Sequence, residues 1–149
     1  MRLGAALDNF TVTIDEAPAA ELRQAILAPL RAYNAAWVGE VALQPLAIFI
    51  RDPKTQEIVG GLWGHSAVGW LFVDLLFVPE HLRRKGLGTA LLRDAEAIAV
   101  RRGDIGVWLS TGSFHAPGFY EKLGYGCFGT HLDYPRGHQT AYYCKRLSG

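Results

Sequence analysis

Residues 70–88, WLFVDLLFVPEHLRRKGLG, are the part of this sequence that says most about its fold. An apolar run ends at Pro79, three basic residues follow at positions 83–85, and Gly86-Leu87-Gly88 then opens an amphipathic segment. This order predicts a buried strand, a basic glycine-rich turn and a helix. The first N–H groups of a helix have no partner inside it, so such a turn is suited to hold a diphosphate.

Gly86 and Gly88 allow two interpretations. Glycines also mark ordinary turns, and one G-x-G pair is weak evidence for a phosphate site. Leu91 occupies the third glycine position of a G-x-G-x-x-G motif, and no G-x-x-x-x-G-K-[ST] loop is present, so the sequence lacks both nucleotide-binding motifs. A steric reason favours the phosphate site, because a Cβ at either position would keep a pyrophosphate away from the helix amides.

The pattern Arg83-x-x-Gly86-x-Gly88 resembles the acetyl-CoA pyrophosphate loop of the GNAT N-acetyltransferases. Further along, residues 111–125 read TGSFHAPGFYEKLGY, and the part from Phe119 to Tyr125 resembles the closing F-Y-x-x-x-G-F/Y motif of that family. The two motifs occur in the family's order, with the expected strand and helix between them. The resemblance in element order covers most of the chain, and its specific motifs lie within residues 70–125.

The resemblance implies one GNAT acyltransferase domain over residues 1–149, with acetyl-CoA as co-substrate. The strand before the loop is expected to splay from its neighbour and to pair its backbone with the pantetheine arm. The implied cofactor-binding residues are Phe77, Val78, Arg83, Arg84, Lys85, Gly86, Gly88 and Thr89. Arg84 stands where glycine is common in the family, so its side chain either adds a phosphate contact or points to solvent.

By the same resemblance Tyr120 is the expected general acid. An amine attacks the thioester, and the departing thiolate gains from a proton that a tyrosine, protonated at neutral pH, can donate. A backbone N–H near Val78 is expected to meet the oxyanion. The alternative for Tyr120 is a core tyrosine that packs the short helix.

Asp74 is the candidate general base. It is an acidic residue in an otherwise apolar strand, where burial is expected, and burial makes a carboxylate a stronger base. The alternative is an Asp that pairs with a neighbouring Arg or backbone group. His115 precedes the FY helix, where the family often has Gln, and it belongs either to the acceptor pocket or to a hydrogen bond at the helix start.

The first helices and the last hairpin build the acceptor pocket in this family. Aromatic walls would suit a small cationic amine through cation–π contacts, although an ordinary core needs aromatic residues too. The candidate lining residues are Tyr33, Asn34, Trp37, Trp63, Trp70, Tyr134 and His138.

Composition sets the remaining expectations. The chain has 149 residues, half of them hydrophobic, which fits one globular domain. A net charge of +1 gives no reason to expect nucleic acid or an anionic membrane as partner. Cys127 and Cys144 form no C-x-x-C pair, so we expect reduced thiols in a cytoplasmic protein. The histidines lack metal-binding spacing, no signal peptide is evident, and no segment approaches the ~20 apolar residues of a membrane span.

Periodicity predicts the order of the elements. The alternating segment 10–14, FTVTI, predicts a first strand, and a helix is expected at 19–32 with a short second helix within 33–44. Further strands are expected at 46–51, 57–66, 70–78, 106–110, 125–132 and 139–147, and further helices at 87–100 and 116–123. Strand 70–78 is expected to be buried on both faces. The fold class is therefore α/β, a mixed twisted sheet of about six to seven strands flanked by helices.

These observations predict an N-acetyltransferase that moves the acetyl group from acetyl-CoA to a primary amine, of a small molecule rather than a protein, by direct attack through a tetrahedral intermediate. The alternative is a non-catalytic GNAT-fold module that binds acyl-CoA. Tyr120 and the Gly86/Gly88 loop favour the enzyme. Many members of the family are dimers, so a homodimer is one expectation that the residues leave open.

Overall fold

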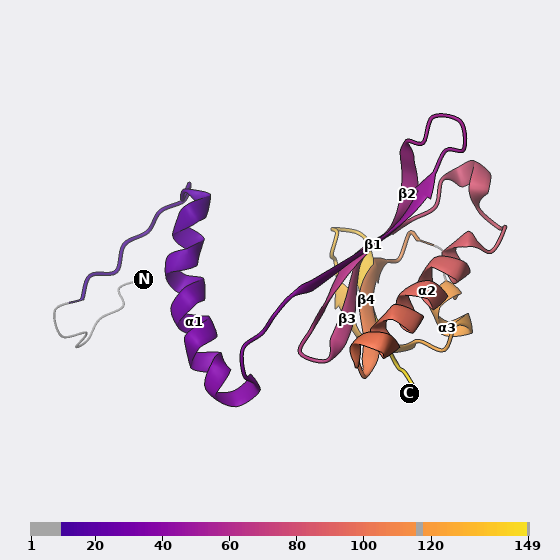
Figure 1. Cartoon of the computed structure of the whole chain (residues 1–149). Helices are drawn as coiled ribbons and strands as arrows, with labels where there is room; N and C mark the ends of the chain where they lie inside the picture. Colours follow the sequence, from indigo (N-terminus) through magenta and orange to yellow (C-terminus); the bar gives the residue numbers. More distant parts are fainter. Residues whose placement is uncertain (1–9, 116–117, 149) are drawn as a thin grey trace. The chain divides into compact units, whose positions relative to one another are not determined.

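The structure is a computed structural model that describes residues 10–115 and 118–148. The chain forms two compact units, Met1–Glu40 and Val41–Gly149. In Figure 1 the first unit is the indigo and violet part that contains helix α1, and the second contains the sheet. The predicted single domain over residues 1–149 stays a prediction.

The first unit contains a short 3-10 turn, Ala20–Leu22 (η1), that runs directly into helix α1, Arg23–Val38. The predicted second helix within 33–44 is wrong, because α1 itself continues as far as Val38 and residues 39–43 form no helix. Its apolar spacing goes on past position 32 with Tyr33 and Trp37, and the helix ends only at Gly39, whose φ of 71° closes it.

Residues 10–14 form no strand, so that prediction is also wrong. Alternating β-branched residues favour an extended backbone. A strand forms only where a neighbouring backbone completes the hydrogen-bond ladder, and the sequence pattern alone does not supply that neighbour.

Within the described residues the second unit contains one sheet of six strands in the order β1-β2-β3-β4-β6-β5. Its strands are β1 (Gln44–Arg51), β2 (Ile58–Ala67), β3 (Trp70–Phe77), β4 (Gly106–Gly112), β5 (Gly126–Leu132) and β6 (Gln139–Arg146). Neighbours pair antiparallel except β3 and β4, which are parallel and joined through a 3-10 turn, Glu80–Leu82 (η2), and helix α2, Leu87–Arg102. A mixed α/β sheet with flanking helices is thus confirmed.

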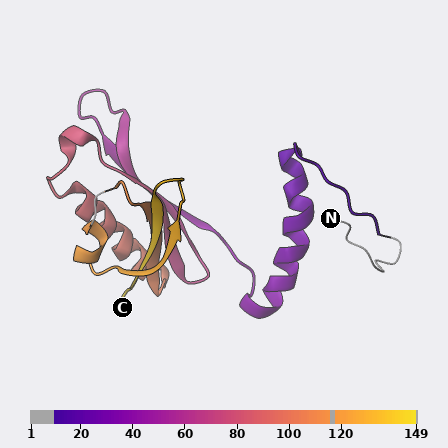
Figure 2. The same cartoon turned by 180° about the vertical axis from the view of Figure 1, so that it is seen from behind.

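Helix α2 packs on one face of this sheet and builds the core. In the two views of Figures 1 and 2, α2 and the short helix α3, Phe119–Lys122, lie on the same side of the sheet. The buried apolar residues are Leu46, Leu62, Leu71, Val73, Leu91, Leu92, Ala95, Ala99, Val107, Leu109 and Tyr125. The helix residues among them lie on one face of α2, as expected of an amphipathic helix.

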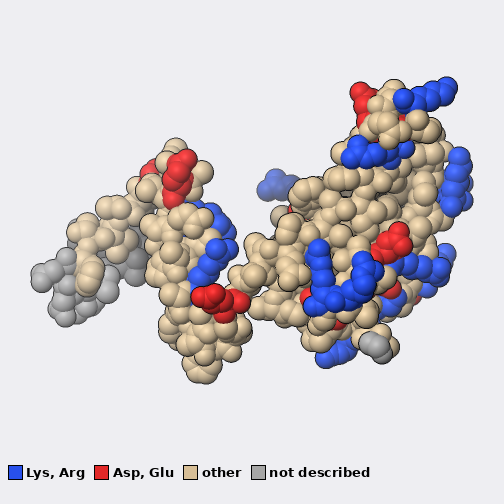
Figure 3. Space-filling view, viewed as in Figure 1, with Lys and Arg blue, Asp and Glu red and all other residues tan. Residues whose placement is uncertain are grey.

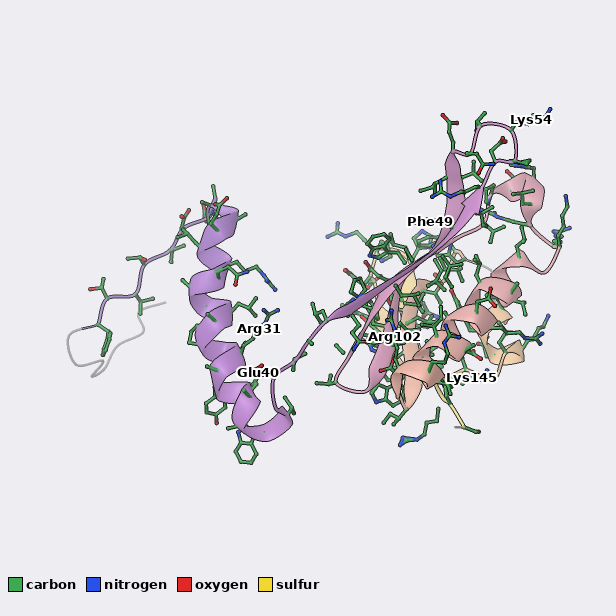
Figure 4. The ribbon with its side chains drawn as sticks, viewed as in Figure 1. Arg31, Glu40, Phe49, Lys54, Arg102 and Lys145 are labelled. Carbon is green, nitrogen blue, oxygen red and sulfur yellow. The ribbon has the colours of Figure 1, made fainter. Side chains whose placement is uncertain are left out.

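Two polar anchors fix α2 on the sheet (Figure 4). At its C-terminal end Arg102 donates hydrogen bonds of 2.9 Å to the carbonyl oxygens of Gln44 and Pro45 on β1. In its middle Glu96 forms an ion pair of 2.9 Å with Lys145 of β6. These contacts hold the helix in place on the sheet, and with it the loop at its N-terminus.

Strand β3 departs from its prediction. Leu71 and Val73 are buried against α2, but Leu75 and Phe77 are 61% and 54% exposed, so the strand is not buried on both faces. The register between β2 and β3 shifts opposite Asp74, which breaks the alternation in the second half of the strand.

Candidate active site

The parallel strands β3 and β4 separate within the sheet. Their residues pair from Trp70 with Gly106 to Val73 with Leu109, and the pairing ends there although both strands continue. Beyond this point, among the residues that the structure describes, β3 pairs only with β2, and β4 pairs only with β6. The expected splay is therefore confirmed, and the opening leaves strand backbone that can pair with an extended ligand.

Phe77 is the last residue of β3 and Val78 follows it, beside this opening, where the resemblance placed them. The Phe77 side chain is exposed and that of Val78 is half-buried against the core. Their pairing with a pantetheine arm stays a prediction.

Asp74 lies at the bulge where the separation begins. Its side chain is exposed, so the predicted burial is wrong. The bulge is the physical reason, because it removes Asp74 from the regular in-and-out alternation of the strand. A role as general base stays a prediction, and it no longer has burial as its support.

Helix α2 begins beside the same strand end, with Gly86 as its N-cap in the left-handed region at φ 80°. The first bond within the helix runs from the N–H of Ala90 to the carbonyl of Gly86, at 3.0 Å. The N–H groups of Leu87, Gly88 and Thr89 come before it and have no acceptor inside the helix. No side chain of the described residues caps the helix start, so these donors and the positive end of the helix dipole are available to an anion.

The basic loop before α2 adds positive charge. Arg83 donates through Nε to the carbonyl oxygen of Val78 at 2.9 Å, and its guanidinium lies 5.9 Å from the centre of the Phe77 ring. This bond ties the loop to the end of β3 and uses only one of the guanidinium nitrogens. Arg84 and Lys85 are exposed, and Figure 3 shows blue side chains on the side of the second unit where this loop lies.

The two loop glycines differ in what an added side chain would meet. Gly86 adopts a backbone conformation that other residues rarely take, while no atom lies within 4 Å of the position a Cβ would occupy. At Gly88 a Cβ would lie 3.1 Å from Cζ of Phe119. Gly88 therefore makes room for the phenyl ring of the second motif, and this contact brings the two motifs together.

Tyr120 projects from α3 into a cluster of aromatic rings. Its ring centre lies 5.1 Å from that of Phe119, 5.9 Å from Tyr125 and 5.7 Å from Tyr143. Burial of the ring raises the pKa of the Tyr120 hydroxyl, which keeps it protonated and able to donate.

Two other tyrosines of this cluster donate their hydroxyls to carboxylates. Tyr125 donates to Glu96 at 3.0 Å, and Tyr143 donates to Glu121 at 2.6 Å. Burial and the nearby Glu96 carboxylate raise the pKa of Tyr125, while the hydrogen bond to Glu121 raises the pKa of Tyr143 to about 12. Sequence reasoning missed Tyr143 and both glutamates, since no motif includes Tyr143 or Glu96, and Glu121 occupies a position of the F-Y-x-x-x-G motif at which the residue is not specified.

The candidates for the acceptor pocket fall into three groups. Tyr33, Asn34 and Trp37 belong to α1 in the first unit. Trp63 and Trp70 alternate with core-facing residues on β2 and β3, and Tyr134 and His138 lie in the β5–β6 turn. Their part in an acceptor pocket stays a prediction.

His115 is exposed in the loop after β4, and its backbone N–H donates to the carbonyl of Gly112 at 3.0 Å. Its ring centre lies 4.6 Å from that of Phe114, which in turn lies 5.3 Å from the ring of His138. The loop after β4 and the β5–β6 turn therefore meet at this ring cluster.

Among residues 10–115 and 118–148 no three His, Cys, Asp or Glu side chains are grouped so as to hold a metal ion. The same residues include no helix with the length and apolar character of a membrane span. Cys127 and Cys144 are free thiols, the first exposed and the second half-buried.

Comparisons with known proteins agree with the features of the fold and site described above. The model of the acetyltransferase (GNAT) family matches residues 13–125. The acetyltransferase Atu2258 of Agrobacterium fabrum is 44% identical over 106 residues, which cover 71% of this chain and 77% of that protein. Blasticidin-S acetyltransferase of Streptomyces morookaense is 46% identical over 82 residues, 54% of this chain and 60% of that protein.

Solved structures agree. A crystal structure of an acetyltransferase from Bacillus cereus has a TM-score of 0.81 at 29% identity, with 91% of this chain and 98% of that chain covered. An aminoglycoside 6'-N-acetyltransferase crystallised with coenzyme A shares the fold, with a TM-score of 0.61 at 20% identity over 71% of this chain and 74% of that chain. The family match and the close relatives show that this chain belongs to the GNAT family of acetyltransferases.

Proposed function

We propose that this chain transfers the acetyl group of acetyl-CoA to a primary amine of a small molecule. The observation that carries the proposal is the end of the β3–β4 pairing at Val73 and Leu109, at an opening whose strand β3 leads directly into the basic loop and α2. An extended pantetheine arm fits the opening, and the diphosphate at the other end of the same molecule fits the helix start.

The diphosphate is bound by the N–H groups of Leu87, Gly88 and Thr89, with the basic side chains of residues 83–85 around it. Each charge-assisted contact of this kind is worth about 1.5–3 kcal/mol. Because Arg83 also holds the carbonyl of Val78, the phosphate contact and the end of β3 are mechanically linked. Backbone of Phe77 and Val78 pairs with the pantetheine arm, and the N–H of Val78 meets the oxyanion.

Tyr120 acts as the general acid. The amine nitrogen attacks the thioester carbon, a C–N bond forms, and the C–S bond then breaks with its electron pair on sulfur. The proton of Tyr120 goes to that sulfur, and solvent returns a proton to the phenolate. The proton that the amine loses goes to Asp74 or to a water molecule, and the exposed position of Asp74 at the bulge allows either route.

A small-molecule acceptor is supported by the blasticidin-S acetyltransferase relative, at 46% identity over 54% of the chain. Among amines, the proposal favours antibiotics and similar small cationic compounds over protein N-termini or lysines. A cytoplasmic location and a homodimer stay predictions.

The test combines calorimetry of acetyl-CoA binding with a screen for thiol release over blasticidin S, aminoglycosides, streptothricins, amino acids and peptides. The proposal expects binding and amine-dependent release of CoA, with one acetyl group added to the acceptor by mass spectrometry. The variant Tyr120→Phe should keep acetyl-CoA affinity and lose about 10²-fold or more in kcat, as the removal of a general acid does. Absence of acetyl-CoA binding would overturn the proposal, and binding without turnover on any amine would favour a CoA-binding module.

A further inference from the structure

Three tyrosines from different parts of the chain meet beside the candidate active site. Tyr120 comes from α3, Tyr125 precedes β5, and Tyr143 lies in β6. The rings of Tyr125 and Tyr143 both lie within 6 Å of the Tyr120 ring, centre to centre, at 5.9 Å and 5.7 Å. The Tyr120 ring is therefore held between its neighbours.

The three hydroxyl groups differ in their hydrogen bonding. Those of Tyr125 and Tyr143 each donate to a carboxylate, at 3.0 Å and 2.6 Å. Within the described residues the Tyr120 hydroxyl has no hydrogen-bond partner. No buried side-chain oxygen of these residues lacks a partner, so the Tyr120 oxygen reaches the surface, where a ligand can accept its proton.

Helix α3 cannot orient Tyr120 by itself. It has four residues, Phe119–Lys122, and a helix this short has little stability of its own. The bond from Tyr143 to Glu121 joins α3 to β6, and β6 is held by pairing on both sides, with Leu109 of β4 and Cys127 of β5 opposite Tyr143. A side chain of the rigid sheet thus fixes the residue next to Tyr120.

We propose that Tyr143 and Glu121 are positioning residues, which hold the Tyr120 ring so that its hydroxyl faces the leaving thiolate. This inference rests on the proposed function, in which Tyr120 is the general acid. A displacement of about 1 Å in a reacting group can cost on the order of 10²-fold in rate, so loss of one anchor has a measurable effect.

The experiment is a double-mutant cycle on kcat for acetyl transfer, measured by thiol release from acetyl-CoA. Blasticidin S is the acceptor, and hydroxylamine replaces it as a small nucleophile if blasticidin S is not acetylated. The variants are Tyr143→Phe, Tyr120→Phe and the double variant. Tyr143→Phe keeps the ring and removes the hydroxyl that bonds Glu121.

The proposal expects Tyr143→Phe to lower kcat by roughly tenfold, with the KM for acetyl-CoA unchanged. In the Tyr120→Phe background the same substitution should change kcat less than about twofold, because the group it positions is already absent. Glu121→Ala should behave like Tyr143→Phe, and Glu121→Gln, which keeps an acceptor oxygen, should recover most of the rate. Tyr142→Phe is the matched control, since Tyr142 points to the other face of β6 and packs on Phe128.

If Tyr143→Phe lowers kcat by the same factor in the wild-type and in the Tyr120→Phe background, its role is merely structural and the positioning proposal is overturned. If Tyr143→Phe leaves kcat unchanged while Tyr120→Phe lowers it, the positioning proposal is also overturned. The role of Tyr120 as general acid is then still supported. An unimpaired Tyr120→Phe would overturn both the general acid and its positioning. Far-UV circular dichroism and the unfolding midpoint of each variant confirm that all are folded under assay conditions.

Discussion

Replacing Gly86 by alanine tests the backbone geometry on which the anion site at the start of α2 depends. Gly86 has φ 80° and ψ 5°, a left-handed conformation that costs an L-residue with a Cβ about 1–2 kcal/mol. No atom of the described residues lies within 4 Å of the added Cβ, so we expect the cost to come from the backbone and not from a clash. We therefore expect Gly86→Ala to lower the free energy of unfolding by about 1–2 kcal/mol, a fall of roughly 2–8 °C in Tm.

The comparison with asparagine makes this test specific. Asn tolerates the left-handed region better than other residues with a Cβ, so Gly86→Asn should lose clearly less stability than Gly86→Ala, despite its larger side chain. Gly88→Ala is the second control. Its contact of 3.1 Å with Phe119 needs a small shift of the ring, and alanine is the better helix residue by about 0.5–1 kcal/mol, so its stability should change little.

Urea unfolding followed by circular dichroism measures all three variants, and calorimetry with acetyl-CoA follows below the transition. If the backbone at position 86 of Gly86→Ala relaxes to another conformation, the N–H groups at the start of α2 turn away from the diphosphate. We therefore expect weaker acetyl-CoA binding together with the lower stability. If Gly86→Ala is as stable as the wild type, or Gly86→Asn is the less stable of the two, the left-handed N-cap is refuted.

Three further predictions follow from the core and its polar contacts. Leu92 is fully buried, so Leu92→Ala should cost about 2–5 kcal/mol in urea unfolding, and a loss below 1 kcal/mol would contradict its place in the core. Glu96→Ala removes the acceptor of Lys145 and Tyr125 and should cost about 1–3 kcal/mol, less when Lys145 is also replaced by Met, as thermal unfolding of the single and double variants will show. The pKa of Tyr143 is raised to about 12, against about 10 in the unfolded chain, so its stabilisation is complete below pH 10 and is lost as the pH rises towards 12. The wild type should therefore lose more stability than Tyr143→Phe between pH 9 and 11.5, and equal losses would contradict the bond to Glu121.

Local signals in the sequence predicted much of the second unit. The amphipathic spacing of α2, with Gly86 before it and Gly103 after it, predicted a helix at 87–100, and the observed helix ends two residues later at Arg102. Such a helix depends on residues close together in the chain, which is why one sequence suffices to predict it. The separation of β3 and β4 was anticipated only as something that the resemblance to the GNAT family implies.

Features that depend on the register between paired strands were not predicted. The bulge at Asp74 arises from the pairing of β2 with β3, and it reversed the expected burial of this residue and of the end of β3. Tyr143 reaches Glu121 only because β6 pairs with β4 in one particular register. A shift of one residue would turn every side chain of β6 to the opposite face, and no local pattern in residues 139–147 specifies that register.

The most direct test of the acetyl-CoA site is a titration of the ¹⁵N-labelled protein with acetyl-CoA, followed by the amide signals in two-dimensional NMR. The account predicts that the largest changes occur in two places, at the N–H groups of Arg84 to Thr89 and at those from Asp74 to Val78. Desulfo-CoA, which keeps the diphosphate and lacks the thioester, should reproduce the changes at the start of α2. Signals at both places that stay unchanged while others shift would contradict the placement of the diphosphate and of the pantetheine arm.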